Sequence, residues 1–348
     1  MKKISTLVLL LALMMPVNAK KYSPYVIATD YVKADGKTDC ADALQKMIDE
    51  NPHRTLYFPD GVYVLSHSLK TPANPEHAVH LVLANFATLK AAESWQKGSG
   101  ALLCLGASEP FNNITLNGSN YGLEGGILDG RGVADGVSID SGRETRINHV
   151  SIKNVQVGLH IKNGANNGSS DADIIDVNIV GNDDAHAIGV LIEGYDNTLT
   201  NMRISHVNVG VSCQSGGNSM KNIHPLYCFA KTQDYESSVG FIVRQSNNWL
   251  DYCYSDQFAT GFKLGEHACC NLTDCFAWWY SGKVPFQTAI ACEGGLDAFV
   301  SGLHVGFSGD CEKVSLLLGE EGGNGCLEHI YMHRHVLSPE DVSPVYRR

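Results

Sequence analysis

Three passages between Asn197 and Asp256 match one another residue for residue: Leu199-Thr-Asn-Met-Arg-Ile-Ser-His206, Met220-Lys-Asn-Ile-His-Pro-Leu-Tyr227 and Trp249-Leu-Asp-Tyr-Cys-Tyr-Ser-Asp256. Each is followed by a Gly-apolar-x-apolar segment. This anchor segment occurs at Gly136, Gly158, Gly189, Gly210, Gly240 and Gly261, with degenerate copies at Ala289 and Val314. A spacing of roughly 20 to 30 residues indicates a solenoid, because each unit can bury its apolar face only against its neighbours.

Apolar and polar residues alternate within these passages, which indicates strands with one side facing inward. Stacking the units places equivalent residues in columns of neighbours about 4.8 Å apart. Two columns are predicted to form the core: Val150, Val177, Met202, Ile223, Tyr252, Cys275, Leu303, Ile330, and Ile152, Ile179, Ile204, Pro225, Tyr254, Ala277, Val305, Met332. One outward column predicts a hydrogen-bonded ladder at a corner: His149, Asp176, Asn201, Asn222, Asp251 and Asp274.

The N-terminal part of the chain carries a different pattern. Asp30-Tyr-Val-Lys-Ala-Asp-Gly-Lys-Thr-Asp39 precedes a helical periodicity from Ala41 to Glu50, with Thr38 or Asp39 as the predicted N-cap. Leu56-Tyr-Phe-Pro-Asp-Gly-Val-Tyr-Val-Leu65 then predicts a hairpin around a Pro-Asp-Gly turn. A helix and a hairpin at residues 30–66 would cover the open end of a solenoid, which otherwise exposes core and strand edges.

These motifs resemble the N-terminal signature of the pectate-lyase superfamily, which includes polygalacturonase-like enzymes and phage tailspikes. Gly126-Ile-Leu-Asp-Gly-Arg-Gly132 is similar to a turn of polygalacturonase-like proteins. The resemblance implies an all-β fold, a single-stranded right-handed parallel β-helix over residues 20–348 with an N-terminal capping helix, and a carbohydrate-directed function. Of the polygalacturonase-like catalytic motifs only the Asp-Asp pair is present, at Asp183-Asp184, and the arginine motifs of calcium-dependent pectate lyases are missing.

The first 19 residues read as a secretory signal peptide: Lys2 and Lys3, an apolar run, and Val17-Asn18-Ala19 as the cleavage site. They predict a secreted or periplasmic protein, and no later segment is apolar for the length of a membrane span. The net charge of −11 disfavours nucleic acid as a partner. A polysaccharide or oligosaccharide substrate is therefore expected, and the oligomeric state stays open.

The 11 cysteines are an odd number, so at least one has no partner within the chain. Several occupy apolar repeat positions, where a buried thiol behaves as a small hydrophobe: Cys213, Cys275 and Cys292. Disulfides at Cys269/Cys270 or Cys311/Cys326 are the alternative.

Two further outward columns gather reactive side chains on one patch, which predicts a catalytic site. Its candidate catalytic residues are Arg203, His206, His224, Tyr227, Asp251 and Asp256. Insertions at residues 182–188, 228–239, 280–288 and 308–313 are expected to leave the same corner and to form a wall beside the patch. Candidate substrate-binding residues are Asp183, Asp184 and His186 in the first insertion, and Trp249, Trp278 and Trp279 as platforms for sugar rings.

Two reactions fit the predicted patch. Glycoside hydrolysis needs two carboxyl groups, which Asp251 and Asp256 could supply, or one of them with Asp183 or Asp184. β-Elimination of a uronate instead needs a base, a cation beside the carboxylate and an acid, for which the candidates are His206 or His224, Arg203 and Tyr227.

Hydrolysis is preferred, elimination is the alternative, and a non-catalytic glycan-binding β-helix is the rival from another class. No cofactor is assigned. Ca²⁺ suits the oxygen-rich side chains of the predicted patch, although no loop has the spacing of a calcium motif.

Overall fold

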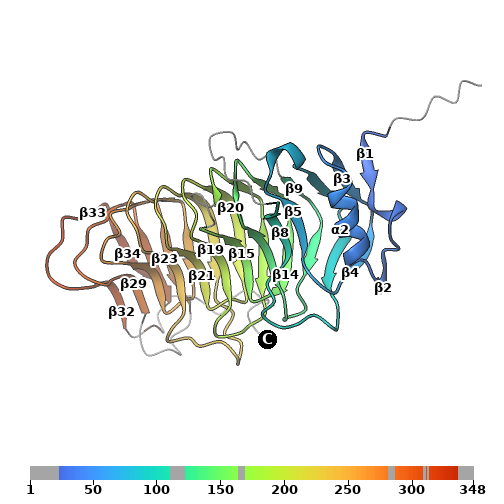
Figure 1. The fold of residues 1–348 in the computed structure, drawn as a ribbon. Helices are drawn as coiled ribbons and strands as arrows, with labels where there is room; N and C mark the ends of the chain where they lie inside the picture. Colours follow the sequence, from blue (N-terminus) through green and yellow to red (C-terminus); the bar gives the residue numbers. More distant parts are fainter. Residues whose placement is uncertain are drawn as a thin grey trace, which may run out of the picture.

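The computed structural model describes residues 23–109, 122–163, 169–280, 287–308, 311 and 313–335. These residues wind into a right-handed parallel β-helix, whose strands form sheets of 22, ten and two strands (Figure 1). The predicted fold class is confirmed. The predicted signal peptide lies outside the described residues and stays a prediction.

The coils contribute strands to three faces. Face 1 is the ten-stranded sheet of β5 (Leu69–Pro72), β8 (Ala101–Ser108), β11 (Asp135–Ile139), β15 (Val157–Ile161), β19 (Ile188–Ile192), β21 (Val209–Cys213), β23 (Val239–Val243), β26 (Thr260–Leu264), β29 (Gln287–Cys292) and β32 (Val314–Leu318). Face 2 comprises β1 (Tyr25–Ile27), β3 (Thr55–Phe58), β6 (His80–Leu83), β9 (Gly122–Glu124), β13 (Arg146–Asn148), β17 (Asp173–Ile175), β24 (Trp249–Asp251), β27 (Asn271–Thr273), β30 (Phe299–Ser301) and β33 (Cys326–Glu328). Face 3 comprises β2 (Asp35–Asp39), β4 (Gly61–Leu65), β7 (Ala87–Ala91), β10 (Ile127–Asp129), β14 (Ser151–Val155), β18 (Asn178–Gly181), β25 (Tyr254–Asp256), β28 (Phe276–Trp279), β31 (His304–Ser308) and β34 (Tyr331–His335). Two strands run through faces 2 and 3 without interruption: β20 (Thr198–Ser205) and β22 (Ser219–Leu226). The remaining elements are the strand pair β12 (Gly142–Arg143) and β16 (Ser169–Ser170), and the short 3-10 helices η1 (Ala28–Asp30) and η2 (Pro75–His77).

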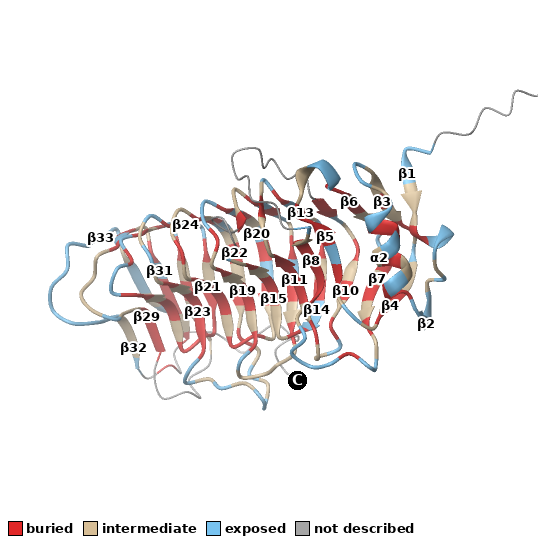
Figure 2. Cartoon of the chain, in the orientation of Figure 1, coloured by how far each residue is buried: buried red, intermediate tan, exposed pale blue. Residues whose placement is uncertain are grey.

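The core runs along the inside of the coils, where buried residues alternate with exposed ones (Figure 2). The anchor glycines lie at the start of face 1 and let successive coils approach closely. At Gly189 an added Cβ would lie 2.4 Å from Ile204 Cγ2 and 2.5 Å from the Gly210 carbonyl oxygen. Glycine is favoured at Gly189 because a side chain there would overlap the next coil.

The predicted helix is present as α2 (Ala41–Asp49), at the N-terminal end of the solenoid (Figure 1). Its N-cap residue is Cys40, so the predicted caps Thr38 and Asp39 are wrong, although an Asp39 carboxylate oxygen accepts from the Ala41 amide at 3.1 Å. The role of this helix as a cap remains a prediction.

The predicted hairpin at Leu56–Leu65 is wrong. Both strands are present as β3 and β4, but β3 pairs with β6 and β4 pairs with β7, all parallel. The Pro-Asp-Gly turn therefore joins two faces of one coil instead of folding two strands against each other.

The predicted register of the third passage is also wrong. Trp249 pairs with Ser219, not with Met220, so Leu250 and Cys253 point inward while Trp249 and Tyr252 are exposed. A shift by one residue moves every side chain to the opposite side of a strand. In the core columns Cys253 replaces Tyr252 and Ser255 replaces Tyr254, and in the corner column Tyr252 replaces Asp251.

The other predicted core residues are buried as far as Leu303 and Val305, whereas in the last described coil Ile330 is partly buried and Met332 is 44% exposed, so Met332 as a core residue is wrong. The corner column consists of residues with positive φ between faces 2 and 3: His149, Asp176, Asn201, Asn222, Tyr252 and Asp274. Asn222 Nδ2 donates to Asn201 Oδ1 at 2.8 Å, as a ladder requires.

None of the eleven cysteines forms a disulfide, so the alternative of disulfides at Cys269/Cys270 or Cys311/Cys326 is not realised. Cys213 and Cys275 are buried, as predicted for small hydrophobes. Across the described ranges, no helix has the length and apolar character to cross a membrane.

Candidate active site

A histidine–aspartate pair lies at the corner where face 3 gives way to face 1. His206 directly follows β20, Asp183 follows β18 one coil earlier, and His206 Nδ1 lies 2.9 Å from Asp183 Oδ1. Gly181 makes this approach feasible, because a Cβ there would lie 2.2 Å from the His206 carbonyl oxygen. Both side chains remain accessible, with 43% and 32% of their surface exposed.

A second histidine–aspartate pair lies one coil further on. His224 on β22 places Nε2 3.4 Å from Oδ2 of Asp256, the last residue of β25. The other oxygen of Asp256 accepts from Gln257 Nε2 at 3.1 Å. Tyr254 stacks on the His224 ring, with ring centroids 4.1 Å apart and 16° between the planes. The ring of His224 is therefore held both at its edge and across its face.

Cys228 follows β22, and the carboxylates of both pairs influence its thiol. Burial is the main cause that raises the pKa of the Cys228 thiol, and the carboxylates of Asp183 and Asp256 act in the same direction. Both carboxylates are thus close enough to this thiol to act on it, although their backbones belong to coils three steps apart.

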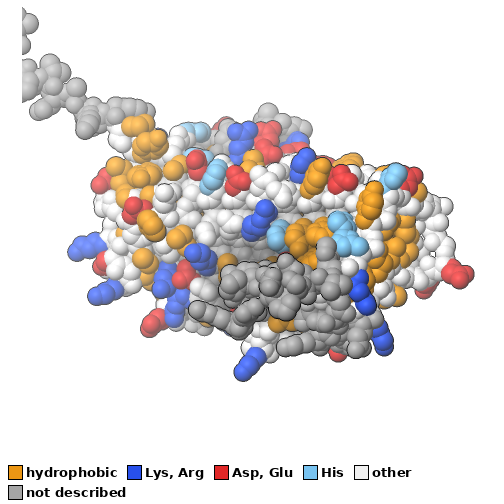
Figure 3. All heavy atoms as spheres, turned by 180° about the vertical axis from the view of Figure 1, so that it is seen from behind, with side chains coloured by type: hydrophobic (Ala, Val, Ile, Leu, Met, Phe, Trp, Pro, Cys, Tyr) orange, Lys and Arg blue, Asp and Glu red, His pale blue; other side chains and the backbone are white. Residues whose placement is uncertain are grey.

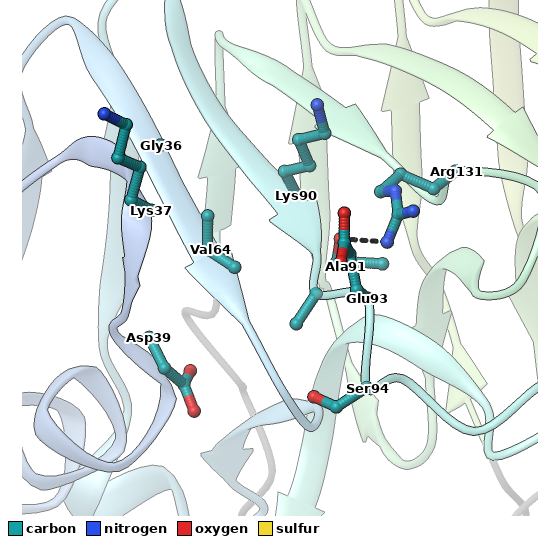
Figure 4. A pocket seen from close by; sticks show the side chains of 10 residues that line it. Gly36, Lys37, Asp39, Val64, Lys90, Ala91, Glu93, Ser94 and Arg131 are labelled. Carbon is teal, nitrogen blue, oxygen red and sulfur yellow. Dashed lines mark hydrogen bonds between the residues drawn. The ribbon is translucent and has the colours of Figure 1, made fainter.

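A cavity of about 510 Å³ opens beside the first pair. Asp183 and His206 form part of its wall, together with Asp129 and Arg131 from the Gly126–Gly132 turn. A second cavity of about 530 Å³ shares Arg131 and extends toward the N-terminal coils. Figure 4 shows this second cavity, in which the Arg131 guanidinium bonds to the Ala91 carbonyl oxygen at 3.5 Å and Asp39 lies on the opposite side. The two cavities are therefore neighbours on either side of Arg131.

An outward column of face 3 continues from the second pair toward the C-terminal coils. It contains, in order of the coils, Arg203, His224, Tyr254, Phe276 and His304. Figure 3 shows the corresponding surface, on which hydrophobic side chains gather between histidines, with a basic side chain at one end. Neighbouring rings lie close together: centroids are 4.8 Å apart for Tyr254 and Phe276, and 4.6 Å apart for Phe276 and His304.

The parallel column carries Trp278 next to Asp256. The Trp278 ring lies over Gly306 of the following coil, where a Cβ would be 2.4 Å from Trp278 Cε3. An indole that rests on backbone in this way presents a flat surface beside the second pair. Trp279 points inward and is 1% exposed, so its predicted role as a sugar platform is wrong.

Three other candidates lie elsewhere than predicted. Tyr227 is buried, and burial raises its pKa to about 12, so it does not face the site. Asp251 lies on β24, across the bend at Tyr252, and pairs with Lys221 at 3.1 Å. Trp249 lies at the start of β24 in a different cavity.

The insertion after β18 holds the remaining candidates. Asp184 Oδ1 accepts from the His186 amide at 2.9 Å within a tight turn, and neither residue lines the cavity. Arg203 is exposed on face 3, where its guanidinium donates to the Met202 and Asn222 carbonyl oxygens. The structure therefore brings together Asp183, His206, His224 and Asp256, with Arg203 and Trp278 beside them.

The sequence was compared with models of protein families. The family model described as rhamnogalacturonase A/epimerase, pectate lyase-like matches residues 27–233, which is more than half of the chain. The chain belongs to this family. A search of curated protein sequences finds no match.

Solved structures of similar fold come from several sources. The tailspike protein of E. coli bacteriophage HK620 in complex with a pentasaccharide aligns with a TM-score of 0.67 and 12% identity, over 90% of this chain and 65% of that chain. An endo-xylogalacturonan hydrolase from Aspergillus tubingensis aligns with a TM-score of 0.60 and 14% identity, over 89% and 93%. An alginate lyase from Paenibacillus sp. str. FPU-7 gives 0.56 and 14%, over 88% and 98%. At these identities the likeness shows the fold.

Several residues of this pectate lyase-like protein that build the site were missed by sequence reasoning. Tyr254 was assigned to the core because of the register error, and Cys228 was assigned to a loop. Asp129 and Arg131 lie in the Gly126–Gly132 turn, which was noted as a fold motif but not as part of a site. Asp129 and Arg131 could have been found by noting that Arg131 and His206 both follow a face 3 strand, and so lie at the same corner of the solenoid.

No group of three or more His, Cys, Asp and Glu side chains in the described ranges is arranged to hold a metal ion. The carboxylates of the two pairs are engaged by histidines. Carboxyl and imidazole groups paired in this way can transfer protons.

Proposed function

We propose that this protein is an exported glycoside hydrolase that cleaves a polysaccharide with inversion, using Asp183 and Asp256 as its two carboxyl groups. One observation carries the proposal: each carboxylate bonds to a histidine on one of the two coils between them, at 2.9 Å for His206 and 3.4 Å for His224. Hydrolysis needs two such groups on either side of the scissile bond.

The spacing of the coils favours inversion. Asp183 and Asp256 lie three coils apart, which corresponds to about 14 Å along the solenoid axis. Each side chain leans toward the other, because its histidine partner belongs to an intervening coil. Inverting enzymes hold their carboxyl groups about 6.5 to 9.5 Å apart, with room for a water molecule, whereas retaining enzymes need about 5 Å.

Access to solvent suggests which carboxyl takes which role. Asp183 borders the cavity and is 32% exposed, so it is placed to take a proton from an attacking water. Asp256 is 10% exposed and lies beside Trp278, so it is placed to protonate the leaving oxygen of a sugar held on that ring. An indole face suits the apolar C–H face of a pyranose.

The test is an assay of the wild-type protein on a panel of polysaccharides, which reads released reducing ends and, separately, the ultraviolet absorbance of unsaturated uronates. Asp183→Asn and Asp256→Asn are each expected to lower kcat at least about 100-fold, the usual contribution of a general acid or base. Asp251→Asn is the matched control, since Asp251 is ion-paired with Lys221 on β24 and should leave kcat unchanged.

Full activity in both Asp183→Asn and Asp256→Asn would refute the site. Binding to a glycan without any product would instead support the non-catalytic rival. Recovery of the protein outside the cytoplasm with its N-terminus at Lys20 would test the predicted export.

Elimination of a uronate is the second candidate, and one observation favours it. Arg203 is the direct neighbour of His224 in register, and its guanidinium bonds only to backbone carbonyl oxygens in the part of the chain that the structure describes. A cation beside a base is what elimination needs to neutralise the uronate carboxylate. The predicted acid Tyr227 is buried, which weakens this alternative.

A further inference from the structure

A cavity separate from the candidate active site lies at the corner where face 1 gives way to face 2. It has a volume of about 680 Å³ and is formed by three successive turns, those before β20, β22 and β24. None of its lining residues borders the cavity of Asp183 and His206. Trp249, predicted as a platform for the catalytic patch, belongs to this corner instead.

The lining of this corner cavity combines two exposed rings with amide side chains. Tyr195 and Trp249 are 43% and 46% exposed. The side-chain amides of Gln245 and Asn247 are exposed and have no hydrogen-bond partner among the described residues, and the Gln214 amide donates only to Ser212 Oγ, at 2.6 Å. Single exposed aromatic residues are ordinary on protein surfaces, but two of them in one cavity with unused amides are not.

The charge of the cavity is also informative. Asp196 is its one charged side chain among the described residues that line it, and no Lys, Arg or His takes part. An anionic ligand would meet a carboxylate and no cation there. A ligand with many hydroxyl groups and apolar C–H faces suits the rings and the amides equally well.

The turns that carry this lining are held in place from below. Asn197, Asn218 and Asn248 are fully buried and stack as a ladder directly beneath them. Asn197 Nδ2 donates to Asn218 Oδ1 at 2.9 Å, and the Asn218 amide donates to Asn248 Oδ1 at 3.0 Å. The ladder also bonds to the turns themselves, since Asn248 Nδ2 donates to the Ser215 and Gln245 carbonyl oxygens, both at 2.9 Å. A rigid, ready-formed site loses less conformational freedom when it binds a ligand.

We propose that this corner cavity is a binding site for a neutral oligosaccharide, separate from the acid–base pairs. Trp249 and Tyr195 provide the ring surfaces. The side-chain amides of Gln245 and Asn247 donate to and accept from sugar hydroxyls, and the Asp196 carboxylate accepts from them. The cavity lies before the first residues of β20 and β22, whereas His206 and Cys228 follow their last residues. A glycan chain bound in the cavity would therefore not block the active site. The proposal does not depend on the reaction proposed above.

The test is isothermal titration calorimetry of the full protein with hexasaccharides of β-linked glucose, xylose and mannose, and with a galacturonate hexamer as the charged probe. At least one neutral hexamer is expected to bind. Trp249→Ala and Tyr195→Ala should each weaken that binding about tenfold, the effect of a ring contact worth about 1.4 kcal/mol. Phe86→Ala is the matched control, because Phe86 is 73% exposed and lies outside the cavity.

Circular dichroism and thermal unfolding establish that the variants are folded, and Gln245→Ala replaces either ring variant that is not. Three outcomes would overturn the proposal: no neutral hexamer binds, the ring variants bind as tightly as the wild type, or the galacturonate hexamer binds this site more tightly than the neutral ones. Catalytic activity does not enter any of these readings.

Discussion

The buried asparagine ladder offers a sharp test of how the corner is stabilised. In Asn218→Ala, two donors of Asn197 lose their acceptor, because both its backbone N–H and its Nδ2 donate to Asn218 Oδ1, at 3.1 and 2.9 Å. Each buried donor without a partner costs about 1 to 3 kcal/mol. The substitution is therefore expected to lower the free energy of unfolding by about 2 to 6 kcal/mol, a large share of the stability of a typical domain.

Urea unfolding followed by far-ultraviolet circular dichroism measures this loss. Asn178→Ala is the control: Asn178 is exposed on β18 without a side-chain hydrogen bond in the described structure, and its replacement should change stability by less than about 0.5 kcal/mol. Since a solenoid can unfold in parts, hydrogen exchange at the Asn197 amide should show the effect locally. A loss below about 1 kcal/mol together with unchanged exchange at Asn197 would refute the role given to the ladder.

Three further predictions follow from packing and ionisation. Gly189→Ala should lower the melting temperature markedly, because overpacking costs about 1 to 3 kcal/mol. Gly294→Ala is the control and should not lower it, since a Cβ at Gly294 would meet only Glu266 Cγ, at 3.6 Å. Equal melting temperatures of the two variants would contradict the close contact between coils at Gly189. In a thiol-labelling assay of the native protein, the exposed Cys269 and Cys326 should react first, and labelling of all eleven thiols should require unfolding. Rapid labelling of all eleven thiols in the native protein would contradict the burial described. Burial raises the pKa of Tyr227 from 10.0 to about 12 in the folded protein, so its contribution to stability is complete below pH 10 and is lost as the pH rises toward 12. The urea concentration at the midpoint of unfolding should fall between pH 10 and 12, and should fall less in Tyr227→Phe. An identical fall in the variant would exclude Tyr227 as the cause.

The sequence was sufficient for the fold because its signals repeat. The anchor glycine recurs six times between Gly136 and Gly261, and most inward residues are apolar, so an error in one unit leaves the others intact. The register of the third passage failed for a physical reason. Tyr252 occupies the bend between faces 2 and 3 with φ of 54°, where other coils have Asn, Asp or His, and an aromatic residue at a bend looks like a core residue.

The candidate site was predictable only in part. Asp183 and His206 lie after the ends of their strands, so the alternation of inward and outward residues within a strand does not fix where their side chains point. His206, His224 and Asp183 were identified as candidates. Which carboxylate pairs with which imidazole ring could not be read from the sequence. Ser255 shows the same limit in the core. It is buried and polar, and Gly240 lies so close that a Cβ there would be 2.1 Å from Ser255 Oγ, so no larger side chain such as Tyr254 fits inward. Such pairwise fits between coils are not visible in one strand.

Faces 1 and 3 of the solenoid differ in whether their charged side chains are paired with each other, and this difference favours face 3 as the surface that binds a ligand. On face 1 the charged side chains bond to each other across coils: Lys162 to Asp140 at 2.7 Å, and Lys263 to Glu293 at 3.2 Å. Such pairs cancel locally and leave little field for a ligand. On face 3 the outward column changes its chemistry from coil to coil, while the buried inward residues of the same strands are apolar except for Ser255. Because an outward residue lies one position away from the core, it can be replaced without repacking the coil. A β-helix can therefore vary its substrate at face 3 and at the corners while its fold is kept by the residues between them.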